Sequence, residues 1–212
     1  QNGGQVFDPV TGRAAFNTPA GYDAVDFMKT MKDTVLPPGH RLSMPAGSGN
    51  NLWRGGSAMI VESSYILADF VNRQPDISEH LSAIVPPPGN TDNVTVVYND
   101  WLGIHAHSPN KDLAWEFMKM FFSAETLRNY GLAAGYQSPR RSTFMDFVRE
   151  EPLVQYVYQT LEYGKPYEMM TPAVNDLIDA FGPLYRQVLN NEQGITTAVD
   201  EIARRWDVIL GQ

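Results

Sequence analysis

Aromatic, carboxylate, amide and guanidinium side chains occur together in several short stretches that the sequence predicts to be strand ends or loops. Flat rings pack against the faces of sugar rings, and the polar groups form paired hydrogen bonds with sugar hydroxyls. These stretches therefore indicate a site that binds carbohydrate. The candidate ligand-binding residues are Trp53, Glu62, Ser63, Ser64, Tyr65, Asn99, Asp100, Trp101, Gln137 and Arg140.

Several aromatic and basic residues also have a structural interpretation. Trp53 could equally pack in the core, and Arg140 with Arg141 could form a solvated pair. Tyr65 and Trp101 stand at boundaries between predicted strands and loops, which favours a place in a site. The aromatic residues at helical spacing are predicted to lie in the core; they are Trp115, Phe117, Phe121 and Trp206.

The sequence contains no G-x-S-x-G, H-E-x-x-H or phosphate-loop motif. His105 and His107 lie two residues apart, so an extended backbone places them on one face, where Asp100 could complete a metal site. They could also be ordinary histidines at a strand end. A small α/β enzyme with Asp100, His105 or Glu62 as acid–base groups remains an alternative, although the spacing of the carboxylates does not indicate a paired-carboxylate site.

The composition limits the class of protein. With 212 residues, 43% of them hydrophobic and 19% charged, the chain is predicted to be globular, as one large domain or two small lobes. A net charge of −8 argues against nucleic acid or an anionic membrane surface as a partner. The absence of cysteine excludes disulfides, thiol nucleophiles and zinc–thiolate sites. No apolar run reaches the roughly 18 residues of a membrane-spanning helix.

The N-terminal half is predicted to mix helices and short strands. Thr18 as N-cap and Pro19 as the first residue indicate a helix that ends before Pro37. The predicted strands cover residues 58–61, 81–85 and 94–98, residues 101–105 are extended, and a two-turn helix covers residues 66–72.

Helices dominate the C-terminal half, which together with the few strands indicates an α/β chain. Ser108-Pro109 and Ser123 resemble helix starts, Thr197 with Asp200 resembles a capping box, and Gly182-Pro183 predicts a kink or break. The predicted helices cover residues 109–121, 124–130, 143–150, 152–163 and 174–188, followed by a final helix near the C-terminus, with a loop over residues 131–142.

The order of short motifs resembles the C-terminal half of the extracellular solute-binding proteins of bacterial ABC importers, in the sugar-binding group that includes the maltose-binding protein. The most specific motif is SPNKDLAWEF at residues 108–117. The others, in chain order, are FNTP at residues 16–19 with Ala24 and Phe27, WRGGSAM at 53–59, IVPPPG at 84–89, SPR at 138–140, and the tail over residues 196–202 with Leu210.

The resemblance implies a type II periplasmic-binding-protein-like α/β fold, with two lobes, a hinge and a ligand cleft between the lobes. Residues 1–97 would belong to the second lobe, residues 98–145 would form a crossing segment of the first lobe, and residues 146–212 would return to the second. The first lobe would be largely missing from this chain, which begins at Gln1 without an initiator Met. The apolar face of the helix over residues 113–121 is then expected to be exposed.

The resemblance also implies ligand contacts. Tyr65 falls where an aromatic ring stacks on sugar, and the three residues before it form the adjoining shelf. The other implied contacts are Asn99, Asp100 and Trp101 at the crossing, Gln137 and Arg140 on a loop that reaches the cleft, and Phe181 near a further aromatic position.

The implied function is non-catalytic capture of a sugar or oligosaccharide and its delivery to the membrane permease of an ABC importer, without a cofactor. Ligand contacts from both lobes would favour the closed state. The implied partners are the permease and the N-terminal half of the same protein. The implied location is periplasmic or extracellular, with a lipid anchor at the N-terminus as an option. A polyamine or peptide ligand and a dimerising module with the helical tail as interface remain alternatives.

Overall fold

The structure, a computed structural model, describes residues 1–36, 52, 55–64, 66, 76, 79–166 and 171–211. The chain divides into two compact units. Unit 1 contains Gln1–Leu42, Pro87–Val97 and Tyr163–Gln212, and unit 2 contains Ser43–Pro86 and Tyr98–Glu162. The chain therefore passes more than once between the units.

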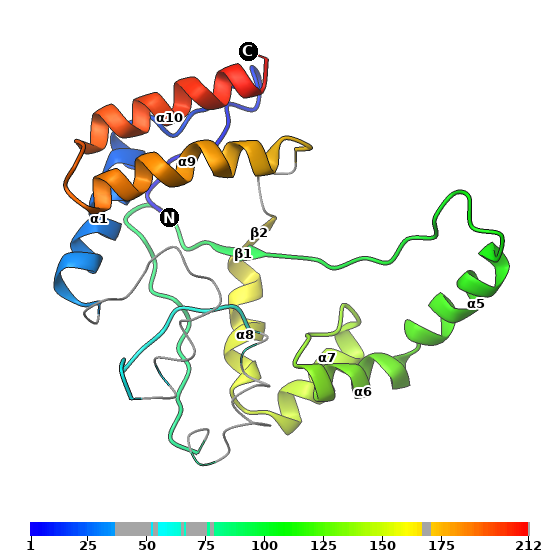
Figure 1. The fold of residues 1–212 in the computed structure, drawn as a ribbon. Coiled ribbons are helices and arrows are strands. Elements are labelled where there is room, and N and C mark those ends of the chain that lie inside the picture. Colours follow the sequence, from blue (N-terminus) through cyan, green and yellow to red (C-terminus); the bar gives the residue numbers. More distant parts are fainter. Residues whose placement is uncertain are drawn as a thin grey trace. The chain divides into compact units, whose positions relative to one another are not determined.

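The described part of unit 1 combines three α-helices with a small parallel sheet (Figure 1). The sheet pairs Thr95 with Gly164, Val96 with Lys165 and Val97 with Pro166. The strand predicted over residues 94–98 is thereby confirmed, whereas its partner was not predicted. The elements are α1 (Pro19–Thr34), β1 (Thr95–Val97), β2 (Gly164–Pro166), α9 (Val174–Leu189) and α10 (Ile195–Ile209).

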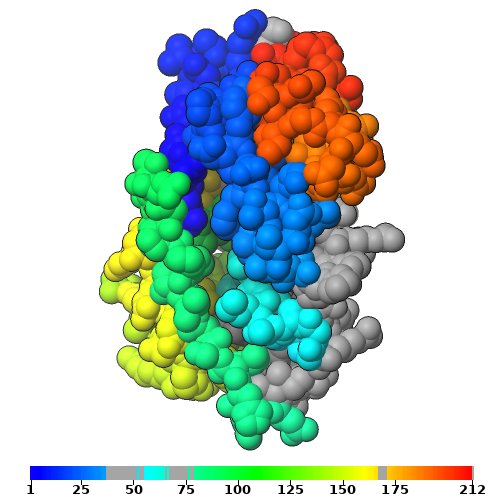
Figure 2. All heavy atoms as spheres, turned by 90° about the vertical axis from the view of Figure 1, so that its left-hand side faces the viewer, coloured from blue at the N-terminus to red at the C-terminus, as the bar shows by residue number. Residues whose placement is uncertain are grey.

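Trp206 is the centre of the unit 1 core. It is buried with Leu177, Leu184 and Ile202, and its indole Nε1 donates a hydrogen bond of 2.9 Å to the carbonyl of Leu177. The prediction that Trp206 is a core residue is confirmed. N-terminal side chains cover the same cluster, and Figure 2 shows the blue N-terminal residues against the orange and red residues of the last helix; the covering residues include Val6, Phe7, Ala14 and Phe16.

The helix starts of unit 1 test two predictions. Thr18 and Pro19 start α1 as predicted. The capping box of Thr197 with Asp200 is wrong, because α10 begins at Ile195 after Gly194, and the Asp200 carboxylate instead accepts a hydrogen bond of 2.7 Å from the Tyr22 hydroxyl of α1.

Of the kink or break predicted at Gly182-Pro183, the break is wrong, because α9 is one helix that includes Pro183. Buried residues on both sides of the proline, Leu177 and Leu184 among them, pack into the same core. Tertiary packing thus outweighs the backbone hydrogen bond that proline cannot donate.

The described helices of unit 2 are α5 (Lys111–Phe121), α6 (Ala124–Ala134), α7 (Arg141–Glu150) and α8 (Val154–Thr160), which continues into a 3₁₀ turn (Leu161–Tyr163). A small core lies between α7 and α8 and is formed by Phe144, Phe147 and Val154.

Among the described residues of both units, none of the helices has the length and apolar character needed to span a membrane.

A capping serine sets the start of α6, and a glycine with left-handed backbone sets its end. The Ser123 hydroxyl accepts a hydrogen bond of 3.2 Å from the backbone N–H of Thr126, so the predicted start is confirmed. The helix continues past the predicted end at Tyr130 and stops at Gly135, which has a φ of 73° in the left-handed region. The predicted loop over residues 131–142 is therefore too long at both ends, because α6 covers residues up to Ala134 and α7 begins at Arg141.

Two of the predicted strands are absent. Residues 58–61 and 81–85 form neither strand nor helix, and Met59, Val61 and Ile84 are exposed. A strand needs a hydrogen-bonded neighbour, and no described residue pairs with either segment. The predicted helix over residues 66–72 lies outside the described residues, apart from Ile66.

Helix α5 begins later than predicted and is less buried. It starts at Lys111, and Ser108 accepts a hydrogen bond from the Asn110 N–H in a local turn before it. The placement of Trp115 and Phe117 in the core is wrong, since they are 54% and 52% exposed. The exposure of the apolar face of this helix, which the family resemblance implied, is confirmed.

The difference in burial between α9 and α5 predicts that the same leucine-to-alanine change lowers the stability unequally in the two helices. Leu177→Ala, at a fully buried position, should lower the free energy of unfolding by about 2–5 kcal/mol, because it leaves a cavity in the core. Leu113→Ala, at a helical position that is 70% exposed, should change it by less than about 0.5 kcal/mol. Urea unfolding followed by circular dichroism measures both. Equal losses would show that α5 is packed.

A second prediction concerns acid. Arg204 and then Arg205 donate hydrogen bonds of 2.7–2.8 Å to the Glu201 carboxylate and lower its pKa from 4.5 to about 2. Because the folded pKa lies below the unfolded one, the stabilisation is complete above about pH 4.5 and is lost as the pH falls through about 2. Carbon-13 NMR titration should show this pKa, and about 1 M NaCl should raise it by screening. A Glu201 carboxyl that titrates near its ordinary value at low salt would contradict the arrangement.

Candidate ligand-binding site

Eight of the ten candidate ligand-binding residues lie in the described part of the chain, and all eight belong to unit 2. Trp53 and Tyr65 lie outside the described residues, so the stacking role of Tyr65 stays a prediction. The structure therefore places the polar candidates and one aromatic candidate, Trp101.

Ser64 and Gln137 are brought together from positions 73 residues apart. The Ser64 hydroxyl donates a hydrogen bond of 2.6 Å to Gln137 Oε1, and Gln137 Nε2 donates one of 2.9 Å to the carbonyl of Gly135. Both ends of the amide are thus oriented by partners. The second N–H of the amide and the lone pairs of the Ser64 oxygen make no further hydrogen bond within the described residues, so they can bind a ligand hydroxyl.

The loop that carries Gln137 is held on its C-terminal side as well. Ser138 Oγ accepts a hydrogen bond of 3.1 Å from the Arg140 N–H, and the buried Thr143 hydroxyl lies 2.5 Å from Ser138 Oγ. The Arg140 guanidinium donates a hydrogen bond of 3.1 Å to the carbonyl of Phe122, the C-cap residue directly after α5. A cation at a helix C-terminus is favourable, so Arg140 anchors the loop as well as facing solvent.

Asn99, Asp100 and Trp101 follow β1 in irregular backbone and are exposed. The Trp101 ring is 82% exposed, which leaves it available to stack on a ligand. Among the described residues, no hydrogen bond joins these three residues to Ser64 or Gln137. The structure thus brings Ser64 and Gln137 together by a hydrogen bond and shows no such bond to the segment after β1.

Glu62 and Ser63 directly precede Ser64 in the chain. The Glu62 carboxylate accepts a hydrogen bond of 3.0 Å from the backbone N–H of Ser63. The Ser63 side chain is exposed. The place of these two residues on a shelf that contacts the ligand stays a prediction.

The histidine pair does not form a metal site in the described part of the chain. The two rings lie 5.7 Å apart between centroids, and His105 Nδ1 accepts a hydrogen bond of 3.3 Å from the His107 backbone N–H. No group of three or more His, Cys, Asp or Glu residues with metal-binding geometry occurs among the described residues, so Asp100 is not a third ligand there.

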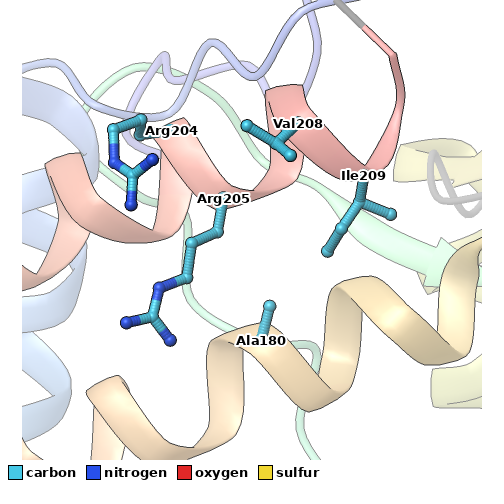
Figure 3. Close-up of a pocket in the computed structure, with 5 residues that line it drawn as sticks. All are labelled: Ala180, Arg204, Arg205, Val208 and Ile209. Atoms are coloured by element: carbon cyan, nitrogen blue, oxygen red, sulfur yellow. The ribbon is translucent and has the colours of Figure 1, made fainter.

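A surface hollow of about 260 Å³ lies between α9 and α10 of unit 1 (Figure 3), and none of the candidate residues lines it. It is smaller than the roughly 300–1,000 Å³ of most ligand pockets. Both arginines beside it are bound to Glu201. Its lining residues are Ala180, Arg204, Arg205, Val208 and Ile209. Phe181 nearby stacks on Tyr185 and packs against the core, so it has a packing role.

Sequence reasoning missed one feature of unit 2, the stacking of Tyr136 on Tyr130. Tyr136 directly precedes the candidate residue Gln137 in the chain and is not among the ten candidate ligand-binding residues. The signal for the stack was the pair of glycines at Gly131 and Gly135, four residues apart at the end of a helix. Such spacing indicates a chain reversal that returns the next residues to the helix.

The Ser64–Gln137 hydrogen bond predicts measurable coupling between two distant segments. In a double-mutant cycle, Ser64→Ala and Gln137→Ala should show an interaction energy of about 0.5–1.5 kcal/mol in urea unfolding. Ser63→Ala is the matched control, because its side chain is exposed. Its cycle with Gln137→Ala should give additive effects within about 0.5 kcal/mol. Additivity in both cycles would show that the two segments are not joined.

Comparison with known proteins indicates the family to which the chain belongs. Residues 1–127 match the sequence family of bacterial extracellular solute-binding proteins, and no curated protein gives a significant match. The family match includes Glu62, Ser63 and Ser64 and the segment after β1, whereas Gln137 and Arg140 lie beyond it.

Solved structures share the fold over nearly the whole chain. A solute-binding protein of Thermotoga lettingae TMO, bound with α-D-tagatose, is 20% identical with a TM-score of 0.75, over 99% of this chain and 54% of that one. Maltose-bound MalE3 of T. maritima is 17% identical with a TM-score of 0.83, over 97% and 54%. The GacH receptor of Streptomyces glaucescens GLA.O is 17% identical with a TM-score of 0.81, over 100% and 55%.

This chain therefore spans about half the length of these relatives. Their shared fold confirms the predicted periplasmic-binding-protein-like α/β class, and the family match covers 127 of the 212 residues. The chain belongs to the family of bacterial extracellular solute-binding proteins.

Proposed function

We propose that this chain takes part in the capture of a sugar or oligosaccharide for delivery to an ABC importer. The observation that carries the proposal is the fold similarity over 97–100% of the chain to solute-binding proteins whose structures hold α-D-tagatose, maltose and acarbose. The family membership of residues 1–127 supports the same class of function.

The site geometry supports a neutral, hydroxyl-rich ligand. Ser64 and Gln137 provide an oriented hydroxyl and amide, and both are uncharged. The exposed ring of Trp101 can cover an apolar face of a sugar. We assign ligand binding to the full candidate set, with Trp53 and Tyr65 included on sequence grounds: Trp53, Glu62, Ser63, Ser64, Tyr65, Asn99, Asp100, Trp101, Gln137 and Arg140.

The mechanism is binding without a chemical step. A ligand that makes more contacts in one conformation shifts the population toward it, by the difference in affinity alone. Solute-binding proteins do not transform their ligands, so Asp100, His105 and Glu62 have no acid–base role in this proposal. A polyamine would require several carboxylates, and the candidate set offers only Glu62 and Asp100.

The partners are part of the proposal. Because the chain spans about half the length of its relatives, we propose that further residues of the same protein share in holding the ligand and cover the exposed face of α5. Residues 98–145 would belong to the first lobe, and residues 1–97 and 146–212 to the second. The complete protein would work outside the cytoplasm, in the periplasm or on the cell surface through a lipid anchor, and would hand its ligand to a membrane permease.

Shared contacts predict weak binding by this chain. If a complete site binds at about 1 μM, or −8.2 kcal/mol, half of that free energy corresponds to a dissociation constant of about 1 mM. Saturation-transfer NMR with maltose, D-tagatose and acarbose should detect such binding, and Trp101→Ala should weaken it. Spermidine and a tripeptide serve as controls for the other ligand classes. Signals from spermidine or the peptide, with none from any sugar, would contradict the proposal, and micromolar sugar binding would contradict the sharing of contacts.

A further inference from the structure

A row of aromatic rings crosses the surface of unit 2 beside the candidate site. The rings of Phe121 and Tyr130 lie 5.5 Å apart between centroids, and those of Tyr130 and Tyr136 lie 5.7 Å apart with an interplanar angle of 9°. Tyr130 therefore has a ring on two sides. Tyr136 ends the row, and its ring contacts no other aromatic ring among the described residues.

The backbone holds Tyr136 in this position. Gly135 ends α6 in the left-handed region, and its N–H donates a hydrogen bond of 2.8 Å to the carbonyl of Gly131. A side chain at Gly131 would approach the Tyr136 carbonyl to 2.9 Å, so only glycine allows the chain to return this closely. The parallel stack is thus preorganised by a fixed turn, which lowers the entropy cost of using it to bind a ligand.

Tyr136 and its stacking partner Tyr130 are both open to solvent. The Tyr136 side chain is 44% exposed, although the turn after α6 is fixed and the adjacent Gly131 and Gly135 are buried. A ring that is held parallel to its neighbour and still open to solvent offers a flat apolar surface. Such a surface suits the face of a pyranose ring, which carries C–H groups.

The residue that follows supplies the polar groups that a sugar also needs. Gln137 is the next residue in the chain, and its amide is oriented by Ser64 and Gly135. Consecutive Cα atoms are about 3.8 Å apart, so the ring and the amide are carried by neighbouring positions of one fixed turn. Unit 2 therefore carries an aromatic ring and an oriented hydrogen-bonding pair on consecutive residues of this turn.

We propose that Tyr136 is the stacking platform for a sugar ring, with the Gln137 amide and the Ser64 hydroxyl binding its hydroxyl groups. The inference rests on the proposed function and adds to it a ring outside the candidate set. It identifies the ligand class as a saccharide with at least one apolar ring face. Tyr130 acts through Tyr136 as a positioning residue, because it supports the ring from beneath.

The test is a set of substitutions in the full chain, with maltose and D-tagatose as probes and saturation-transfer NMR as the readout. Tyr136→Ala should weaken binding between about twofold and tenfold, because stacking is lost. Tyr136→Phe should bind within about twofold of the parent chain, since the ring remains. Phe27→Ala is the matched control, because it removes an exposed ring from α1 of unit 1 and should leave binding unchanged.

The possible results distinguish a failure of the proposed sugar binding from a failure of the stacking role of Tyr136. If the parent chain binds no sugar, the proposed function fails and this inference fails with it. If the parent chain binds and Tyr136→Ala binds equally, only this inference fails. Equal loss in Phe27→Ala, or equal loss in Tyr136→Phe, would also overturn stacking. If circular dichroism shows Tyr136→Ala to be unfolded, Tyr136→Leu replaces it, because leucine keeps the apolar volume without the ring, and the same comparison with Tyr136→Phe decides.

Discussion

The reversal of the chain at Gly135 is the constraint on which the candidate site depends. The left-handed backbone at this residue ends α6, and the close approach at Gly131 allows the following residues to return over the helix. Tyr136 is thereby placed on Tyr130, and Gln137 is placed where Ser64 reaches its amide. Any side chain at Gly131 would meet the backbone of Tyr136, and a β-carbon at Gly135 would strain its φ of 73°. The polar and the aromatic parts of the site therefore share one origin.

The helices of the two units show that an apolar stripe does not by itself bury a helix. Helices α9 and α10 bring Leu177, Ile202 and Trp206 into one core, and the hydrogen bond from Trp206 to Leu177 satisfies a buried donor. Helix α5 has an equally clear apolar stripe, yet none of its residues is buried. Periodicity states which face of a helix is apolar, whereas burial requires a partner surface. This difference explains why Trp206 was placed correctly and Trp115 was not.

The sequence predicted features of local chemistry better than features that join distant segments. Thr18 and Ser123 mark helix starts because the preferences of caps and prolines act within one turn. The strand over Thr95–Val97 forms because Gly164–Pro166 pairs with it, and that partner lies far along the chain. Residues 81–85 have comparable apolar character and form no strand. In the same way, Ser64 and Gln137 were each predicted as site residues, but their contact across 73 positions was not visible in the sequence.

The chemistry of the site follows from which of its polar groups are already engaged. The Arg140 guanidinium donates a hydrogen bond to the carbonyl of Phe122, directly after α5. The Glu62 carboxylate accepts one from the backbone N–H of Ser63. The oriented pair that remains, Ser64 with Gln137, is neutral. A charged ligand would need an opposite charge to offset the loss of its hydration, whereas a sugar needs donors and acceptors at fixed angles and a flat apolar surface. The neutral pair beside the Tyr136 ring offers oriented donors and acceptors and a flat surface, but no charge to oppose that of a cation. A saccharide therefore fits this site better than a polyamine.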